Sequence, residues 1–221
     1  MGLGRLADEV FEAVIFDMDG TLIDSTPAVL RAWSTWAAEQ GLPAEFDRHH
    51  GVPSAGVVRA LLPAARHEAG IARINELELT DVDGIVVLPG AAEALASLAG
   101  AKNAIATSCT IPLAQARIRA SGLVPPSVLI TADDVVRGKP DPDPFLTAAE
   151  RLGADPSRCL VVEDAPMGLK AAHAAGCFTL AVVTTTPREA LHADAIVEDL
   201  SSVEFQPGPD GIRVRLRSPV A

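Results

Sequence analysis

Short apolar runs without polar alternation recur along the chain and predict strands that are buried on both faces. A strand with one exposed face alternates apolar and polar residues, whereas a strand inside a parallel sheet is apolar throughout. Runs of the second kind occupy residues 13–16, 104–107, 128–131, 159–162 and 179–183.

Segments with helical periodicity fill the intervals between most of these runs, at residues 91–99, 112–121, 144–152 and 167–175. Each has a glycine at or just after its end, where glycine is favoured because it adopts the left-handed conformation. These glycines are Gly100, Gly122, Gly153 and Gly176. The alternation of strands and helices predicts an α/β fold, in which a parallel sheet carries helices on both faces.

The stretch from residue 26 to residue 86 departs from this alternation. It shows no convincing strand, and its helical patterns lie at residues 27–40, 55–62 and 64–79. The simplest interpretation is a helical insertion that follows the first strand and sits over the sheet. Near the other end of the chain, residues 212–217 alternate apolar residues with arginine, which fits either an edge strand or a loose end.

Composition narrows the class of protein. The chain has 221 residues, of which 48% are apolar and 21% charged, so it can bury a core and is not disordered over most of its length. Its net charge of −11 argues against nucleic-acid binding as the main activity. No apolar run is long enough for a membrane helix, and residues 1–10 do not resemble a secretory signal. Three cysteines without CxxC spacing favour a reducing compartment, so we expect a cytoplasmic protein. We also expect it to be a monomer.

Polar side chains gather where the predicted strands end. Carboxyl ends of parallel strands share one edge of a sheet, and sites form beyond that edge. The residues that follow the strands are Asp17 and Asp19, then Thr107 and Ser108, then the stretch 133–139 that ends in Lys139, and finally Glu163 and Asp164. We expect four carboxylates, two hydroxyls and one lysine to meet at this edge.

This set of groups suits phosphoryl transfer. Closely spaced carboxylates repel one another unless a cation neutralises them, and hard oxygen ligands suit Mg²⁺. Hydroxyl, amide and ammonium donors from Thr107, Ser108 and Lys139 suit a bound phosphoryl group, with Asp17 as the nucleophile and Asp19 as the group that moves the proton. The chain has 15 arginines and only 3 lysines, so a lysine at this position is informative, because arginine does not replace a point charge equally well.

The motifs around these residues resemble those of the haloacid dehalogenase superfamily of phosphohydrolases. Residues 16–22 read Phe-Asp-Met-Asp-Gly-Thr-Leu, which is similar to that superfamily's first motif. Thr107, Lys139 within 138–142, and Glu163-Asp164 match its second, third and fourth motifs in order. The resemblance implies a Rossmann-like core formed by residues 1–25 and 87–221, with an all-helical cap at residues 26–86.

The same resemblance implies residue roles. Asp17 would form an aspartyl-phosphate, and Asp19 would act first as the general acid and then as the base for the attacking water. Mg²⁺ would be held by Asp17, by the backbone carbonyl of Asp19 and by Asp164. Glu163 is left open as a metal ligand, since subfamilies differ at that position.

Shorter strings are similar to those of the superfamily's sugar-phosphate and polyol-phosphate phosphatases. They lie at residues 50–53, 88–91, 106–108 and 162–166. The similarity implies a Mg²⁺-dependent phosphatase whose partner is a small phosphorylated metabolite, a sugar or polyol phosphate, and not a nucleic acid or a membrane.

Alternatives within the same fold remain. A hexose-phosphate mutase of this superfamily would carry histidine where the chain has Val29 and arginine where it has Ser54. Phosphonate hydrolysis would need a cap lysine, and residues 26–86 contain none. Dehalogenation does not need a second aspartate such as Asp19. A non-catalytic binding module would be expected to lack at least one of Asp17, Asp19, Lys139 and Asp164, and the chain has all four.

Four residues of the predicted cap are weaker candidates for substrate contact. His50, and with less support His49, would either contact the sugar or serve only in packing and helix capping. Trp33 and Trp36, three residues apart on one helix, are expected to belong to the core of the cap more than to a sugar-stacking platform.

Overall fold

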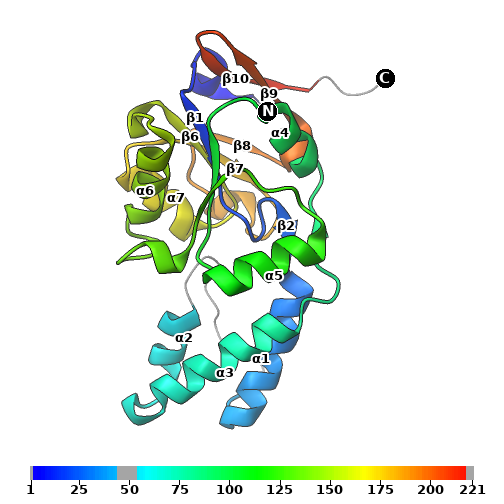
Figure 1. The fold of residues 1–221 in the computed structure, drawn as a ribbon, viewed down its shortest axis with the longest axis vertical. Helices are drawn as coiled ribbons and strands as arrows, with labels where there is room; N and C mark the ends of the chain where they lie inside the picture. Colours follow the sequence, from blue (N-terminus) through cyan, green and yellow to red (C-terminus); the bar gives the residue numbers. More distant parts are fainter. Residues whose placement is uncertain (1, 44–53, 218–221) are drawn as a thin grey trace.

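The computed structural model describes residues 2–43 and 54–217, and its centre is a six-stranded parallel sheet (Figure 1). Along the sheet the order is β5-β4-β1-β6-β7-β8. The strands are β1 (Ala13–Phe16), β4 (Asn103–Ala106), β5 (Val128–Ile130), β6 (Cys159–Glu163), β7 (Phe178–Val182) and β8 (Ala195–Val197). The five predicted strands are confirmed, and β8 is a sixth that the sequence pattern did not indicate.

Residues along each central strand point alternately to two different cores. In β1, Val14 and Phe16 belong to one apolar cluster, whereas Ala13 and Ile15 belong to the other. The first cluster includes residues of α4 (Ala91–Ser97) and α5 (Ile111–Ser121), and the second includes residues of α6 (Asp143–Leu152) and α7 (Pro166–Ala174). Because both faces are covered by helices, these strands need no polar positions, which explains the uninterrupted apolar runs. The predicted α/β fold with helices on both faces is confirmed (Figure 1).

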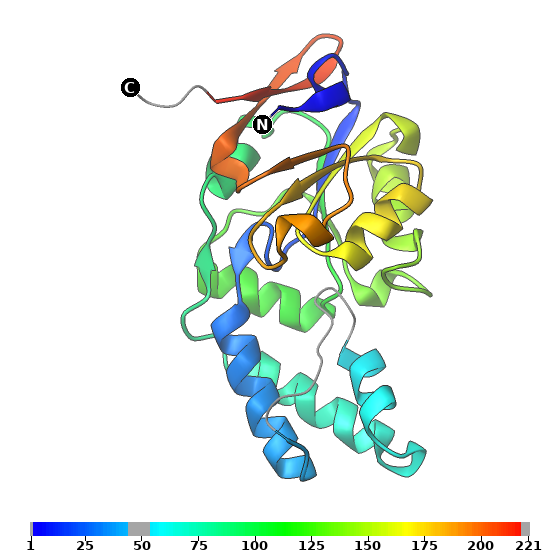
Figure 2. The ribbon, with the colours of Figure 1, turned by 180° about the vertical axis from the view of Figure 1, so that it is seen from behind.

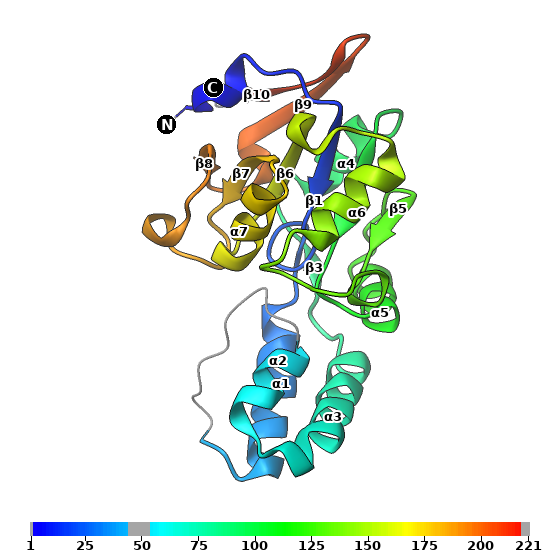
Figure 3. The same ribbon diagram turned by 90° about the vertical axis from the view of Figure 1, so that its left-hand side faces the viewer.

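Three helices form a separate unit below the sheet, which we call the three-helix unit (Figure 3). They are α1 (Thr26–Gln40), α2 (Ser54–Leu61) and α3 (His67–Thr80), the last preceded by a 3₁₀ turn at Ala64–Arg66. Their apolar side chains make a cluster of their own, in which Trp36 is fully buried and donates from Nε1 to the carbonyl of Gly70 at 2.9 Å. The helices expected at 27–40 and 55–62 are confirmed, and the one expected at 64–79 divides into the turn and α3.

The chain enters and leaves the three-helix unit through a small antiparallel ribbon. Strands β2 (Ile23–Asp24) and β3 (Val86–Val87) pair just before α1 and after α3. Each has only two residues, too few for a pattern to predict. The ribbon lies at the predicted junctions of core and cap, whose boundaries at residues 25 and 87 stay a prediction.

A hairpin at the opposite end of the molecule contains the C-terminal alternating segment. It consists of β9 (Val203–Gly208) and β10 (Gly211–Leu216) (Figure 2). Phe205 and Val214 pack into the same cluster as Val14. Of the two interpretations left open, the paired strand is the observed one, although it pairs outside the main sheet. Further short 3₁₀ turns lie at Gly4–Ala7, Ala132–Asp134, Pro156–Arg158, Arg188–Ala190 and Leu200–Ser202.

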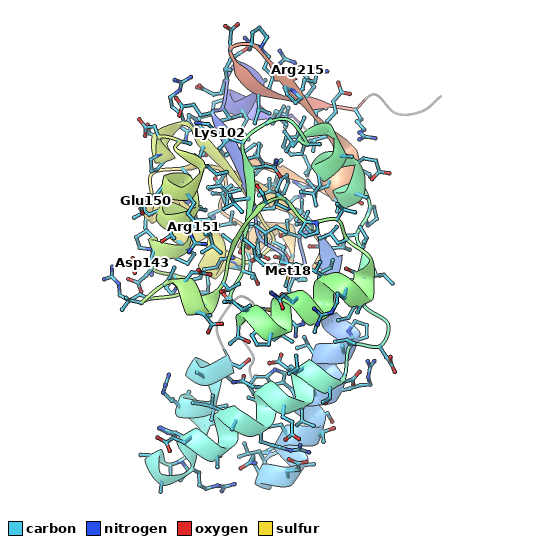
Figure 4. The ribbon with its side chains drawn as sticks, in the orientation of Figure 1. Met18, Lys102, Asp143, Glu150, Arg151 and Arg215 are labelled. Atoms are coloured by element: carbon cyan, nitrogen blue, oxygen red, sulfur yellow. The ribbon has the colours of Figure 1, made fainter. Side chains whose placement is uncertain are left out.

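The two ends of the sheet therefore differ in what covers them. Met18, in the loop after β1, lies near α5 at the end that faces the three-helix unit, and Arg215 lies on the distant hairpin (Figure 4).

Among the described residues, no helix combines the length and apolar character needed to cross a membrane.

Candidate active site

The site lies in a cavity of about 230 Å³ between the carboxyl ends of the central strands and the three-helix unit. Strand β1 is flanked by β4 and β6, so the residues that follow these three strands are brought to one place. Asp17, Thr107, Ser108, Glu163 and Asp164 all line the cavity. The opposite wall comes from the three-helix unit, with Thr26, Val29 and Trp33 on α1, Ser54, Ala55 and Val57 on α2, and Ile71, Asn75 and Glu78 on α3.

Lys139 joins two buried carboxylates, and we call Asp17, Lys139 and Glu163 the Lys139 cluster. The Lys139 ammonium donates to Asp17 Oδ1 at 2.5 Å and to Glu163 Oε1 at 2.8 Å. The other oxygen of Glu163 accepts hydrogen bonds from the backbone amides of Asp164, at 2.8 Å, and Ala165, at 2.7 Å. Glu163 is therefore held by fixed donors on both oxygens.

Two glycines make room for these carboxylates. A Cβ on Gly168, in the first turns of α7, would overlap the Glu163 carboxylate. A Cβ on Gly20 would overlap the carboxylate of Asp164, and Gly20 also has a φ of +89°, which disfavours other residues. The close approach of backbone to carboxylate fixes where the acidic side chains can lie.

Negative charge exceeds positive charge at this point of the site. Carboxylate oxygens of Asp17, Glu163 and Asp164 lie within 4.8 Å of one another, and Lys139 is the one cation in contact with them among the described residues. Burial raises the pKa of Asp17 to about 7. The positive charge of Lys139 offsets only part of this increase, and the negative charge of Glu163 adds to it. Burial, with the charges of Glu163 and Asp17, also raises the pKa of Asp164 well above its ordinary value. Three clustered oxygen donors with uncompensated charge fit a hard divalent cation.

Asp164 is held from its other side by two threonine hydroxyls. Thr21 donates to Oδ1 at 3.2 Å, and Thr185 donates to Oδ2. These bonds orient the carboxylate toward Asp17 and Glu163. Sequence reasoning gave no role to Thr185, which follows β7 at the same edge of the sheet.

A second ionic group lies beside the first, and we call Asp19, Arg117 and Glu78 the Arg117 cluster. Arg117 Nη1 donates to Asp19 Oδ1 at 2.9 Å, and Nη2 donates to Glu78 Oε1 at 3.2 Å. Although burial opposes its charge, the pKa of Arg117 is raised by Asp19 and the neighbouring groups, so it stays a cation. The cluster joins the loop after β1, helix α5 and helix α3.

Asp19 has two further donors. Ser25 Oγ donates to its Oδ1 at 2.7 Å, and Cys109 Sγ donates to its Oδ2 at 3.1 Å. Burial and the adjacent Asp19 raise the pKa of the Cys109 thiol well above its ordinary value, so the thiol remains a neutral donor. The carboxylate of Asp19 is not part of the group formed by Asp17, Glu163 and Asp164. The predicted metal contact through its backbone carbonyl stays a prediction.

The structure brings the predicted site residues together, but Lys139 contacts carboxylates, whereas a phosphate contact was predicted. Thr107 and Ser108 line the cavity, and Thr107 Oγ1 accepts from the amide of Cys109 at 3.1 Å. Lys139 has a fully buried side chain and contacts the two carboxylates, so its predicted contact with phosphate stays a prediction. In the stretch 133–139, Asp133 accepts from the amide of Ile111 at the start of α5 and Asp134 accepts from Thr131, so both are structural.

Arg117 and Glu78 were missed by the sequence analysis, yet a signal for each exists. On α5 the buried residues are Leu113, Ala114, Arg117 and Ile118, and on α3 they are Gly70, Ile74 and Glu78. Each charged residue thus stands on the otherwise apolar or small-residue stripe of its helix. A charge on such a stripe marks a residue with a buried partner.

The weaker candidates of the three-helix unit have different outcomes. Trp36 belongs to the core of the unit, and Trp33 both packs in that core and lines the cavity. Their rings lie edge to face, with centroids 5.2 Å apart. His49 and His50 lie outside the described residues.

Comparison with known proteins gives consistent matches. A family model described as haloacid dehalogenase-like hydrolase matches residues 11–176. Hexitol phosphatase A of Escherichia coli K12 is 42% identical to the chain, over 89% of this chain and 95% of that protein. Validoxylamine A 7′-phosphate phosphatase of Streptomyces hygroscopicus subsp. limoneus is 36% identical, over 89% and 97%.

A solved structure shares the fold. The crystal structure of a hydrolase from Pseudomonas syringae aligns with a TM-score of 0.78 and 29% identity, covering 86% of this chain and 94% of that one. The alignments span nearly the whole of these proteins, so the similarity includes both the sheet and the segment that carries the three-helix unit.

Proposed function

This chain belongs to the haloacid dehalogenase-like hydrolase family, and on that premise we propose that it is a Mg²⁺-dependent phosphatase of small sugar or polyol phosphates. The observation that carries the proposal is the Lys139 cluster with Asp164, a buried group of three carboxylates and one ammonium at the wall of a cavity. Two relatives named as phosphatases, one of them for hexitols, support the reaction and the substrate class.

Asp17 is the proposed nucleophile. Its carboxylate attacks phosphorus, the ester oxygen leaves, and an aspartyl-phosphate forms. Lys139, 2.5 Å from Oδ1, fixes the orientation of Asp17 and stabilises its charged form. Thr107 and Ser108, which line the cavity beside it, are the proposed donors to the phosphoryl oxygens.

Asp19 is the proposed general acid and base. It donates a proton to the leaving ester oxygen and afterwards takes a proton from the water that hydrolyses the aspartyl-phosphate. Ser25, Cys109 and Arg117 hold its carboxylate from three directions, which restricts it to one orientation beside the cavity.

The residues fit a bound magnesium ion, with Asp17, Asp164 and the backbone carbonyl of Asp19 as the proposed ligands. Three carboxylates against one ammonium leave two negative charges, which one divalent cation balances. When bound, Mg²⁺ neutralises and polarises the phosphoryl group. Glu163 contributes to this charge balance, and Lys139 and two backbone amides hold its oxygens in place.

The three-helix unit is the proposed cap, inserted as residues 26–86 into a core of residues 1–25 and 87–221. It supplies one wall of a cavity of about 230 Å³, which is below the roughly 300–1,000 Å³ of pockets for drug-sized ligands and suits a smaller metabolite. Polar groups on that wall, Thr26, Ser54, Asn75 and Glu78, suit a substrate that carries hydroxyls. We place the protein in the cytoplasm as a monomer, where its three free cysteines stay reduced.

A phosphate-release screen tests the proposal. Purified protein with Mg²⁺ is assayed on hexitol, hexose, pentose and glycerol phosphates, and each assay is repeated with excess EDTA. We expect release of inorganic phosphate that depends on Mg²⁺. Absence of release from every ester would overturn the phosphatase, and conversion of a hexose 1-phosphate to the 6-phosphate without free phosphate would favour the mutase.

A further inference from the structure

We propose that Arg117 and Glu78 form a subsite for one hydroxyl of the substrate, the hydroxyl on the carbon next to the phosphorylated carbon. The inference rests on the proposed function, and it names two specificity-determining residues that the motifs do not contain. It is carried by the contacts and burial of the Arg117 cluster, which lines the same cavity as Asp17 and Asp19.

Both charged side chains are almost fully buried, each with 5% of its surface exposed. Arg117 uses Nη1 on Asp19 and Cys109, at 2.9 and 3.3 Å, and Nη2 on Glu78. Glu78 accepts from Arg117 with one oxygen and from Ser54, at 2.9 Å, with the other. Two helices from different parts of the chain thus supply one polar patch.

Arg117 also carries an unused donor. Its Nε is the one buried side-chain nitrogen or oxygen without a hydrogen-bond partner in residues 2–43 and 54–217. Buried donors in folded proteins are nearly always paired, and leaving one unpaired is unfavourable. Since Arg117 lines the cavity, a group bound there is the partner that the structure offers.

The chemistry of the patch selects a hydroxyl. A hydroxyl both accepts and donates, so it can accept from the Arg117 guanidinium and donate to the Glu78 carboxylate. Arg117 is already opposed by two carboxylates, so the patch carries net negative charge and disfavours a second phosphate or a carboxylate. An apolar group would leave Arg117 Nε without a hydrogen-bond partner.

The position of the hydroxyl follows from Asp19. Arg117 is one hydrogen bond away from Asp19, the proposed donor to the ester oxygen. A substrate group that reaches Arg117 while its ester oxygen faces Asp19 is therefore separated from that oxygen by about two carbon atoms. The hydroxyl on the adjacent carbon satisfies this condition.

A role in stability alone does not account for the cluster. Buried ion pairs are often no more stabilising than apolar residues of the same size, because burial removes the hydration of both charges. The neighbouring Val29, Trp33 and Leu113 show that this cavity accommodates apolar side chains. Charged residues here are better explained by a polar ligand.

Matched substrate pairs test the subsite. One pair is glycerol 1-phosphate and propane-1,3-diol monophosphate, which differ only in the adjacent hydroxyl; the second is glucitol 6-phosphate and its 5-deoxy analogue. For the unmodified protein we expect kcat/KM to favour the hydroxylated ester by about 100-fold or more, since a site that hydrogen-bonds a hydroxyl rejects the analogue that lacks it.

Variants of Glu78 and Arg117 then test whether these two residues cause the difference in kcat/KM within each substrate pair. In Glu78→Gln and in Arg117→Met we expect the ratio within each pair to fall below about 10-fold, because the subsite no longer offers paired charges. Glu78→Gln keeps the size of the side chain, so it remains informative if Arg117→Met fails to fold. Arg119→Met and Glu76→Gln, exposed residues of the same two helices, are the controls and should keep the ratio.

The outcomes separate this inference from the proposed function. Phosphate release from both members of each pair at equal rates would overturn the subsite while leaving the phosphatase intact. An unchanged ratio in folded Glu78→Gln and Arg117→Met protein would do the same. Absence of release from every ester in the presence of Mg²⁺ would overturn both.

Discussion

The Lys139 cluster and the Arg117 cluster are built from the same kinds of group but belong to different parts of the chain. Each contains one buried cation between two carboxylates. The Lys139 cluster is formed by residues at the ends of β1 and β6 and by one loop of the core. The Arg117 cluster joins a loop and a helix of the core to α3 of the three-helix unit.

This difference separates chemistry from recognition. The Lys139 cluster has Asp164 beside it and an excess of negative charge, so these residues could hold a metal ion, and none of them belongs to the three-helix unit. The Arg117 cluster exists only while α3 lies against α5, so the proposed hydroxyl subsite forms where the two walls of the cavity meet. The expected effects of breaking each cluster therefore differ in kind.

Removal of Lys139 should have the largest effect. Lys139→Met leaves Asp17 and Glu163 buried without their cation, and breaking a buried pair costs about 3–5 kcal/mol. We expect kcat/KM for phosphate release to fall by about 100- to 1,000-fold, which is the scale for loss of a fixed electrostatic group in an active site. Steady-state phosphate release with Mg²⁺ measures it.

Lys170→Met is the matched control, because Lys170 is exposed on α7. It should behave as the unmodified protein does. Asp17→Asn should lose activity at least as severely while keeping its circular dichroism spectrum. Near-normal turnover in either Lys139→Met or Asp17→Asn would contradict the role of the Lys139 cluster.

Sequence reasoning placed Asp17, Glu163 and Asp164 at one edge of the sheet because each of them ends or follows a strand. It singled out Lys139 as a phosphate contact, and did not predict that Lys139 lies between Asp17 and Glu163. A strand buried on both faces has an unmistakable apolar pattern, and the residue after it must lie at the sheet edge, as Asp17 and Asp164 do. The same reasoning missed β8 (Ala195–Val197), as well as β2 and β3, which have only two residues each. Short strands are defined by their partners, which no local pattern contains.

The Arg117 cluster was not predicted because its contacts join distant segments through helices. Arg117 lies 98 residues from Asp19 and 39 from Glu78 in the sequence. A helix pattern shows which face is buried but not which helix it meets or in what register. Only the packing of α3 against α5 brings the two charges together.

The second prediction is that the free energy of unfolding depends on pH through Asp17 and Asp164, in and beside the Lys139 cluster. Asp17 and Asp164 have raised pKa values, Asp17 from 3.8 to about 7, so the folded protein binds protons there more tightly than the unfolded chain does. Between about pH 4 and 7 the free energy of unfolding of metal-free protein should therefore decrease as the pH rises. The loss should be on the order of 2 kcal/mol in urea unfolding with EDTA at pH 5 and pH 8.

Magnesium should remove this dependence by neutralising the same carboxylates. At a concentration of about 100 times its Kd, a bound ion adds about 2.7 kcal/mol to the free energy of unfolding. Asp17→Asn should flatten the metal-free profile, because it removes one of the titrating groups. Stability that instead increases with pH through this window in EDTA would show that the excess negative charge is not present.

The smallest effect is expected where Arg117 and Glu78 are replaced together. Arg117→Met alone leaves the buried Glu78 carboxylate and the partly exposed Asp19 carboxylate without their cation, and it should lower the free energy of unfolding by about 3 kcal/mol. The double variant Arg117→Met/Glu78→Met removes the unpaired Glu78 charge as well, while Asp19 keeps its hydrogen bond from Ser25. It should lie within about 1 kcal/mol of the unmodified protein, because apolar replacement of a buried ion pair is often nearly neutral. Urea unfolding of the single and double variants measures this, and a double variant no more stable than Arg117→Met would show that the Arg117–Glu78 pair stabilises the fold more than apolar side chains do at these positions.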